Sequence, residues 1–210
     1  MDLSIILSFA LVASLLVISP GPNGLLITKT VATDGKAAGF ANVLGFVTAF
    51  YIQGTMVVFG LAVLLVQSAA LFTMVKIVGA AYLCWIGFKA LKDAWRNKSV
   101  VKTEQQTKSK ALLRYAYLEG LLTNALNPKT SMFYLAIFPQ FLPIEQMTAA
   151  NVYSLVTVHV MLNSLWFCGM VLVLGKLKAL TSSGRVQRWI KGVTGFVFIG
   201  FGLKLATLRN

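Results

Sequence analysis

Two short polar motifs interrupt segments that are otherwise apolar: SPGPNG at residues 19–24 and NALNPK at residues 124–129. Proline removes a backbone N–H donor and clashes with the preceding turn, so each motif is expected to break a helix and free carbonyl and amide groups. Within apolar surroundings such groups are tolerated only inside protein or beside a wet cavity. The alternative is a structural kink of the kind common in membrane helices, but two breaks at matched positions favour a binding site. Its candidate residues are Pro20, Gly21, Pro22, Asn23, Asn124, Asn127, Pro128 and Lys129.

Lys129 is the charged residue of these motifs, and it lies deep in its apolar segment. It follows Arg114 by fifteen residues and precedes Pro139 by ten, which is about 22 Å and about 15 Å of helix at 1.5 Å per residue. A lysine side chain does not easily reach the membrane surface from that depth, so it faces a cavity or a partner. Two interpretations stay open: carbonyls freed by the helix break satisfy the ammonium, or the ammonium binds a ligand carboxylate.

Three titratable residues in or beside apolar segments are candidates for carrying a proton: Asp34, Glu119 and His159. The alternative for the two acids is an interfacial charge, and the alternative for the histidine is a hydrogen-bonded interior residue. His159 and Asn163 are four residues apart and Trp166 follows three residues later, so they share one helical face. Glu119 and Lys129 are too far apart in sequence to pair along one straight helix.

The elements that must position these residues are six apolar segments. The chain of 210 residues is 57% hydrophobic and only 12% charged, whereas a soluble domain carries about 25% charged residues. Runs of about twenty apolar residues are long enough to cross a bilayer as helices. The sequence therefore predicts an all-α polytopic membrane protein. Its six transmembrane helices are expected near 3–27, 40–66, 71–91, 112–138, 150–175 and 189–207. The first segment lacks the basic start of a cleavable signal peptide and is kept as a span.

A long polar stretch divides these segments into two halves. We predict a first three-helix repeat at 1–91, a basic linker at 92–111 and a second three-helix repeat at 112–210. Because each half has an odd number of spans, the two enter the membrane in opposite directions. The first and fourth helices, which open the halves, are the broken ones, and such matched interruptions mark transporter binding sites. Several glycines are expected to allow close helix approach. They are Gly35, Gly39, Gly45, Gly79 and Gly87.

Basic residues set the expected orientation. Most of them fall in three connections on one side: the first connection, with Lys29 and Lys36, the linker, and the connection before the sixth segment. The positive-inside rule assigns this side to the cytoplasm, so both termini are predicted to face outward. The net charge of +13 is then explained by topology and by contact with anionic membrane lipid, and nucleic acid is not predicted as a partner.

Motifs for other chemistry are not found in the sequence. Cys84 and Cys168 both lie in apolar runs and form no CxxC pair, and neither GxSxG nor HExxH occurs. No metal, cofactor or enzymatic activity is therefore predicted. A transporter is favoured, with an intramembrane enzyme and a non-catalytic membrane subunit as alternatives.

Three stretches taken together resemble one known family. They are SPGPNGLLITKTVATDGKAAGFANVLG, GAAYLCWIGFKALKDAWR and NALNPKTSMFYLAIFPQFL, and their order and spacing are similar to those of the LysE/RhtB amino acid efflux proteins. The resemblance covers about residues 15–143. It places motif positions at the eight candidate residues above and at Asp34, Gly35, Gly39, Phe133, Pro139 and Gln140. His159 matches no motif of the family.

The resemblance implies export of amino acids or close derivatives across the bacterial inner membrane, driven by the proton motive force. The family includes exporters of basic and of neutral amino acids, so its name does not fix the substrate. Acidic residues are scarce within the apolar segments, which favours small neutral polar substrates such as threonine or homoserine. Six short helices enclose little volume, so a homodimer is also compatible with the sequence.

Overall fold

The computed structural model describes residues 2–19, 21–59, 69–95, 110–134, 140–142, 146–176 and 184–207. Regular structure in these ranges is helical throughout, as predicted. The helices are α1 (Leu3–Ile18), α2 (Pro22–Asp34), α3 (Lys36–Val58), α5 (Ala69–Trp95), α6 (Lys110–Ala125), α7 (Pro128–Met132), α8 (Ala149–Lys176) and α10 (Gly184–Thr207).

Length and apolarity identify membrane spans among the described helices. α3 and α8 are each long and apolar enough to cross a bilayer, and α1 and α2 together form a third candidate that bends by 52° at the break. The all-helical membrane-protein prediction is confirmed in this coarser form. The division into six spans and two inverted repeats stays a prediction.

The first broken helix extends further than the sequence suggested. α1 ends at Ile18, and α2 continues to Asp34 instead of ending near residue 27. Lys29 therefore lies inside a helix, and its placement in a polar connection was wrong. A single residue, Gly35, joins α2 to α3, and its φ of 90° lies in the left-handed region that glycine adopts without strain. This short link fixes the end of α2 beside the start of α3.

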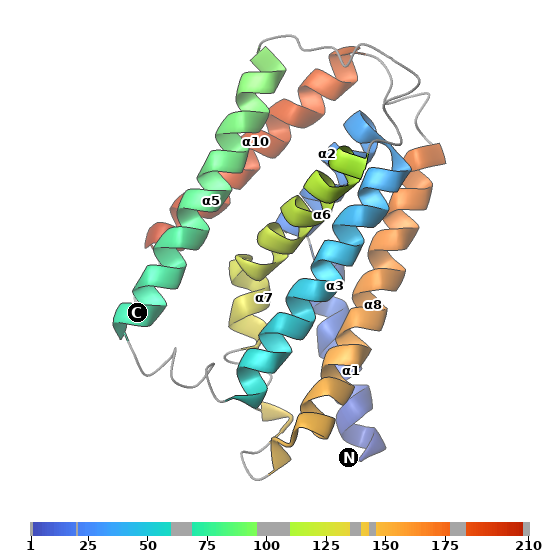
Figure 1. Ribbon diagram of the computed structural model, residues 1–210, viewed down its shortest axis with the longest axis vertical. Coiled ribbons are helices and arrows are strands. Elements are labelled where there is room, and N and C mark those ends of the chain that lie inside the picture. The colour runs from blue at the N-terminus through green and yellow to red at the C-terminus, as the bar shows by residue number, and fades with distance from the viewer. Residues whose placement is uncertain are drawn as a thin grey trace.

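The helices form two neighbouring groups (Figure 1). α5 packs along α10, while α3 lies between α6 and α8, and α1 runs beside α8. α2 contacts α3, α6, α8 and α10. Both halves of the sequence thus contribute helices around α2, which is where the first break lies.

Small residues bring the helix backbones close together at two crossings. A Cβ built on Gly45 would overlap the backbone of Tyr117 and Leu121 in α6, and one built on Gly120 would overlap the backbone of Asn42 in α3. Gly87 in α5 meets Gly195 in α10 in the same way. The predicted role in close packing is confirmed for Gly39, Gly45 and Gly87. Gly35 forms the α2–α3 turn, and the role of Gly79 stays a prediction.

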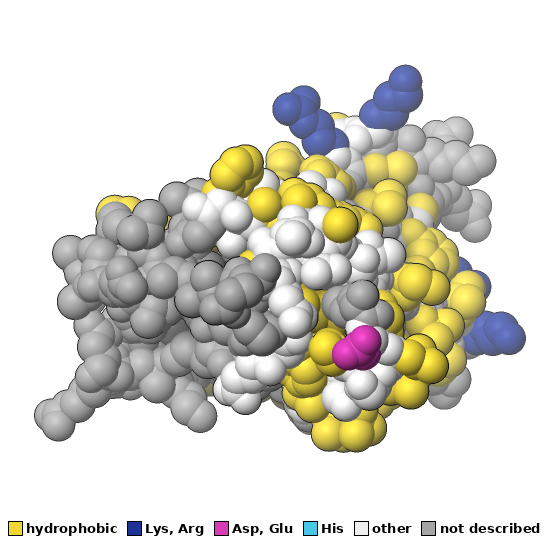
Figure 2. Space-filling view, turned by 90° about the horizontal axis from the view of Figure 1, so that it is seen from below, with side chains coloured by type: hydrophobic (Ala, Val, Ile, Leu, Met, Phe, Trp, Pro, Cys, Tyr) yellow, Lys and Arg dark blue, Asp and Glu magenta, His cyan; other side chains and the backbone are white. Residues whose placement is uncertain are grey.

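The interior is apolar and aromatic, whereas the outer surface carries exposed leucines at helical spacing. α1 exposes Leu3, Leu7, Leu11 and Leu15, and buries Phe9 and Ala13 on its other face. The end-on view in Figure 2 shows hydrophobic side chains spread over much of the described surface. An apolar outer surface of this kind suits contact with lipid, because lipid tails are as apolar as leucine side chains.

The α3–α6 crossing leads to a stability prediction. Gly45→Ala should lower the melting temperature, because its methyl group would press on the α6 backbone at a cost of about 1–3 kcal/mol. Thermal unfolding of the purified protein in detergent measures this. Gly169→Ala is the matched control, since a Cβ there meets nothing within 4 Å and alanine favours a helix by about 1 kcal/mol. Equal melting temperatures for the two variants would contradict the close crossing.

Candidate functional site

Two helices of the site begin with proline, as the motifs predicted. Pro22 is the first residue of α2 and Pro128 is the first residue of α7. Proline lacks a backbone N–H, but at the first position of a helix that N–H would have no acceptor within the helix, so no hydrogen bond is lost. The residue before each proline is extended, as steric contact with the proline ring requires. Asn127 caps α7 by accepting a hydrogen bond from the backbone N–H of Lys129 at 3.0 Å. Pro20 lies outside the described residues.

Three asparagines tie the two breaks together, and we call Asn23, Asn124 and Asn127 the asparagine cluster. Asn23 donates through Nδ2 to Oδ1 of Asn124 at 2.9 Å, and Asn127 donates to Oδ1 of Asn23 at 3.2 Å. Asn124 also donates to the Phe46 carbonyl at 3.0 Å and accepts from the Thr130 hydroxyl at 3.1 Å. All three asparagines are buried. The cluster links α2 to α6, α7 and α3.

Lys129 reaches across to the first break. Its Nζ donates to the carbonyl of Ser19 at 2.6 Å. Its side chain passes over Gly21, where a Cβ would lie 3.3 Å from Nζ. Ser19 follows the last turn of α1, where carbonyls carry partial negative charge. The structure thus agrees with the first interpretation of Lys129, satisfaction by a freed carbonyl, and that carbonyl belongs to the other broken helix.

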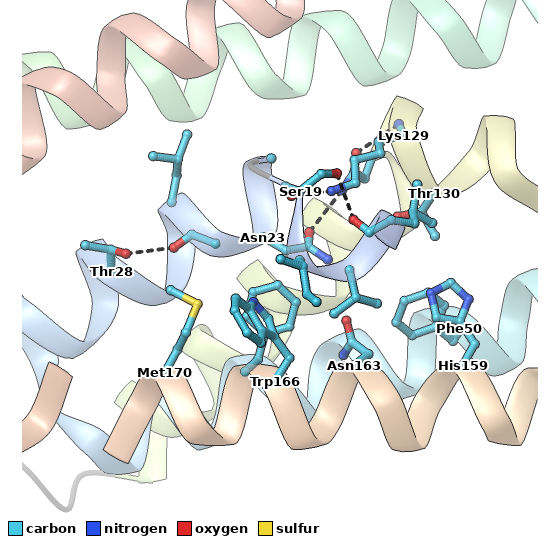
Figure 3. A pocket seen from close by; sticks show the side chains of 18 residues that line it. Ser19, Asn23, Thr28, Phe50, Lys129, Thr130, His159, Asn163, Trp166 and Met170 are labelled. Carbon is cyan, nitrogen blue, oxygen red and sulfur yellow. Dashed lines mark hydrogen bonds between the residues drawn. The ribbon is translucent and has the colours of Figure 1, made fainter. Parts of the chain in front are cut away.

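A cavity of about 270 Å³ lies beside this contact, between the first break, α7 and α8. Figure 3 shows Ser19 and Lys129 on one side of it and Asn163, Trp166 and Met170 on the opposite side, on α8. Five predicted site residues line the cavity: Gly21, Asn23, Asn127, Lys129 and His159. Asn124 does not line it but holds Asn23 in place.

The α8 wall of the cavity combines polar and aromatic groups. His159 is packed against Phe50, with ring centroids 4.3 Å apart, and is enclosed by further aromatic rings. Within the described part of the chain, Nδ1 of His159 and Nδ2 of Asn163 have no hydrogen-bond partner. Trp166 and Met170 continue the wall along α8. The sequence placed His159, Asn163 and Trp166 on one face, and all three line the cavity.

The two acidic candidates lie away from the cavity lining. Glu119 in α6 forms an ion pair with Lys29 of α2 at 2.5 Å. Asp34, at the end of α2, accepts a hydrogen bond from the Thr33 hydroxyl at 2.8 Å. Sequence reasoning missed Lys29 as the partner of Glu119. The available signal was the opposite charge of Glu119, within an apolar segment, and Lys29, two residues after the expected end of another.

The cavity has the groups needed to hold a zwitterion. Lys129 supplies a cation, and the first turn of α2 supplies backbone N–H groups without helical partners, both suited to a carboxylate. The Ser19 carbonyl and the asparagine amides supply acceptors for an ammonium group. Leu25, Phe167 and Met170 supply apolar surface. No aspartate or glutamate is among the described residues that line it, and the described chain holds no cluster of His, Cys, Asp or Glu that could bind a metal.

Comparison with known proteins gives one family. The family described as LysE type translocator matches residues 14–209. The membrane protein YrhP of Bacillus subtilis is 30% identical over 95% of this chain and 97% of its own. The threonine efflux protein of Escherichia coli K12 is 27% identical over 99% of this chain and 100% of its own length. The leucine efflux protein of Enterobacter sp. 638 is 25% identical over 94% of this chain and 92% of its own length. No solved structure matches.

The asparagine cluster leads to a second stability prediction. Asn124→Ala should strongly lower the melting temperature in detergent, because it leaves buried partners on Asn23, Thr130 and Phe46 unsatisfied at about 1–3 kcal/mol each. Asn151→Ala is the control, since Asn151 bonds only locally near the start of α8. If both variants melt at the same temperature, the cluster does not hold the breaks together.

Proposed function

Because the chain belongs to the LysE type translocator family, we propose that it exports small neutral amino acids from the cytoplasm across the bacterial inner membrane in exchange for protons. Threonine and leucine efflux proteins are among its full-length relatives. These relatives support an amino acid with a neutral side chain as the substrate.

The observation that carries the proposal is the cavity where the two broken helices meet. Its polar side pairs Lys129 with the freed carbonyl of Ser19, and its α8 side is largely apolar apart from His159 and Asn163. A substrate carboxylate would take the place of the Ser19 carbonyl on Lys129, beside the first turn of α2. The released carbonyl and the Asn163 amide oxygen would then accept from the substrate ammonium.

Cavity charge supports a neutral substrate, and the volume of about 270 Å³ is sufficient for an amino acid of the size of threonine or leucine. A lysine or arginine side chain would bring a second cation close to Lys129, with no acidic residue in the described lining to balance it. Such a site disfavours basic amino acids.

Helix contacts support an inverted repeat that could alternate access to the cavity. If the broken pairs α1–α2 and α6–α7 correspond, and α3 corresponds to α8 and α5 to α10, then the contact of α3 with α6 is matched by that of α8 with α1. Rocking of one half against the other would expose the cavity to each side in turn.

Proton coupling is proposed for Glu119, with Asp34 and His159 as the other candidates. Glu119 is buried and links the two halves through Lys29, so a change in its charge would act on their relative position. With the orientation that the basic residues predict, both termini face the periplasm and the Glu119 end of the molecule faces the cytoplasm.

Lys129→Gln tests the substrate site. In proteoliposomes with an imposed pH gradient, the wild type should move labelled threonine, homoserine or leucine and exclude lysine. Lys129→Gln should reduce transport about ten-fold or more, because a charge-assisted hydrogen bond contributes about 1.5–3 kcal/mol. Lys110→Gln is the control, since Lys110 is exposed at the start of α6. Wild-type rates in Lys129→Gln would exclude this site, and no movement of any amino acid by folded wild type would exclude amino acid export.

A further inference from the structure

We infer that Lys29 is a positioning residue for transport: its ion pair with Glu119 holds α2 closed over the inner end of the cavity, and release of the pair frees α2 to move. The inference rests on the proposed export function and assigns a moving part to it. It concerns a side chain of α2 that does not line the cavity.

The ion pair is short and largely removed from solvent. Nζ of Lys29 lies 2.5 Å from Oε1 of Glu119, and the side chains are only 16% and 8% exposed. Lys29 belongs to the first predicted half and Glu119 to the second. A buried pair of this kind attracts strongly when both partners are charged, and loss of one partner leaves an uncompensated charge. Such a contact therefore has two distinct states, paired and unpaired.

The ion pair is the second of two side-chain contacts between α2 and α6 described here, and we call these contacts the asparagine tie and the ionic tie. The first is the asparagine cluster, where Asn23 meets Asn124. Lys29 follows Asn23 by six residues, or about 9 Å along α2, and Glu119 precedes Asn124 by five, or about 7.5 Å along α6. The asparagine tie adjoins the cavity, whereas the ionic tie holds the far part of α2. Breaking the ionic tie alone would leave α2 anchored at its first turn.

The far part of α2 closes the cavity toward the end that the basic residues assign to the cytoplasm. Thr28 and Met170 are the last cavity residues in that direction along α2 and α8. Beyond them Val31 and Val171 both press on Gly39 of α3, where a Cβ would lie 2.6 Å and 2.9 Å from their methyl groups. Three helices, α2, α3 and α8, therefore meet beyond the cavity on this side, and the inference assigns to α2 the shift that would open the cavity there.

The ends of α2 permit such a shift. The break precedes Pro22, and Gly35 with φ of 90° is the only residue between α2 and α3. Chain breaks and glycine at element ends absorb the backbone changes of a hinge. α2 is therefore a short helix with a joint at each end, held at its middle by Lys29.

Other charged groups from α2, α5 and α10 lie near the Lys29–Glu119 ion pair. Asp34 of α2 interacts electrostatically with Lys29, with Glu119 and with Lys191 of α10. Lys89 of α5 interacts electrostatically with Glu119. The hydroxyl of Tyr82, also in α5, donates a hydrogen bond to the backbone carbonyl of Glu119 at 3.5 Å. A proton delivered to Glu119 would end its attraction to Lys29 and leave Asp34 as the acid nearest that lysine.

The first experiment measures α2 directly, without transport. Hydrogen–deuterium exchange of the purified protein in detergent is compared for the wild type, Lys29→Met and the charge-swapped double variant Lys29→Glu with Glu119→Lys. Amides of residues 22–34 should exchange about ten-fold faster in Lys29→Met, with α3 and α8 unchanged, and the swapped variant should return toward the wild-type rate. Lys110→Met controls for loss of one basic residue.

Because Lys29→Met leaves Glu119 unpaired, the double variant Lys29→Met with Glu119→Gln covers the case in which the single variant does not fold. It removes both charges and should show the same local increase in exchange. Unchanged exchange in α2, or an equal increase in every helix, would overturn the inference and leave the pair a general structural contact.

The second experiment restrains α2 during transport. In a chain with Cys84→Ser and Cys168→Ser, the double variant Lys29→Cys with Glu119→Cys is joined by a reducible bifunctional methanethiosulfonate reagent. Because this variant lacks Glu119, the readout is counterflow of labelled amino acid without a pH gradient, which needs movement of α2 but no net proton transfer. Cross-linking should reduce counterflow to less than a tenth of the uncross-linked variant's rate, and reduction should restore it. Undiminished movement in the cross-linked protein would overturn the inference. If the wild type moves no amino acid, the export proposal fails, while the exchange experiment still decides the role of Lys29.

Discussion

The structure depends on one constraint: polar backbone and amide groups freed inside an apolar bundle must find partners within the protein. Prolines interrupt helices at two places about a hundred residues apart. Lys129 of the second break donates to the Ser19 carbonyl of the first, and side-chain hydrogen bonds of the asparagine cluster join the two breaks. The arrangement of α2, α6 and α7, and with it the position of the cavity, follows from this mutual satisfaction.

The same constraint explains why the charged group of the site lies on the side of the two breaks. Lys129 uses the Ser19 carbonyl as its partner, and in the proposed site a substrate carboxylate would replace that carbonyl. On α8 the wall is mostly aromatic and aliphatic, and its polar side chains His159 and Asn163 are almost fully buried. Under the proposed function, the cavity would offer polar groups to the common part of an amino acid and an apolar surface to its variable part.

Much of this was predictable because proline and asparagine act locally. The all-helical class, the two breaks and the shared face of His159 and Asn163 follow from residue types and spacing, and the structure contains them. The extension of α2 to Asp34 was missed because Lys29, read as a loop residue, is neutralised by a partner in another helix. The acceptor of Lys129 was also not predictable, since nothing in a sequence states which carbonyl a lysine reaches 110 residues away.

The separation between these partners has a consequence for how the protein is made. Asn23 bonds to Asn124, 101 residues later in the chain, and at 5–20 residues per second synthesis takes roughly 5–20 s to cover that distance. During this interval the Ser19 carbonyl, the Asn23 amide and the Lys29 ammonium are already made while their partners are not. The newly made first half must therefore wait until the second half is made before these polar groups can reach the partners they have in the structure.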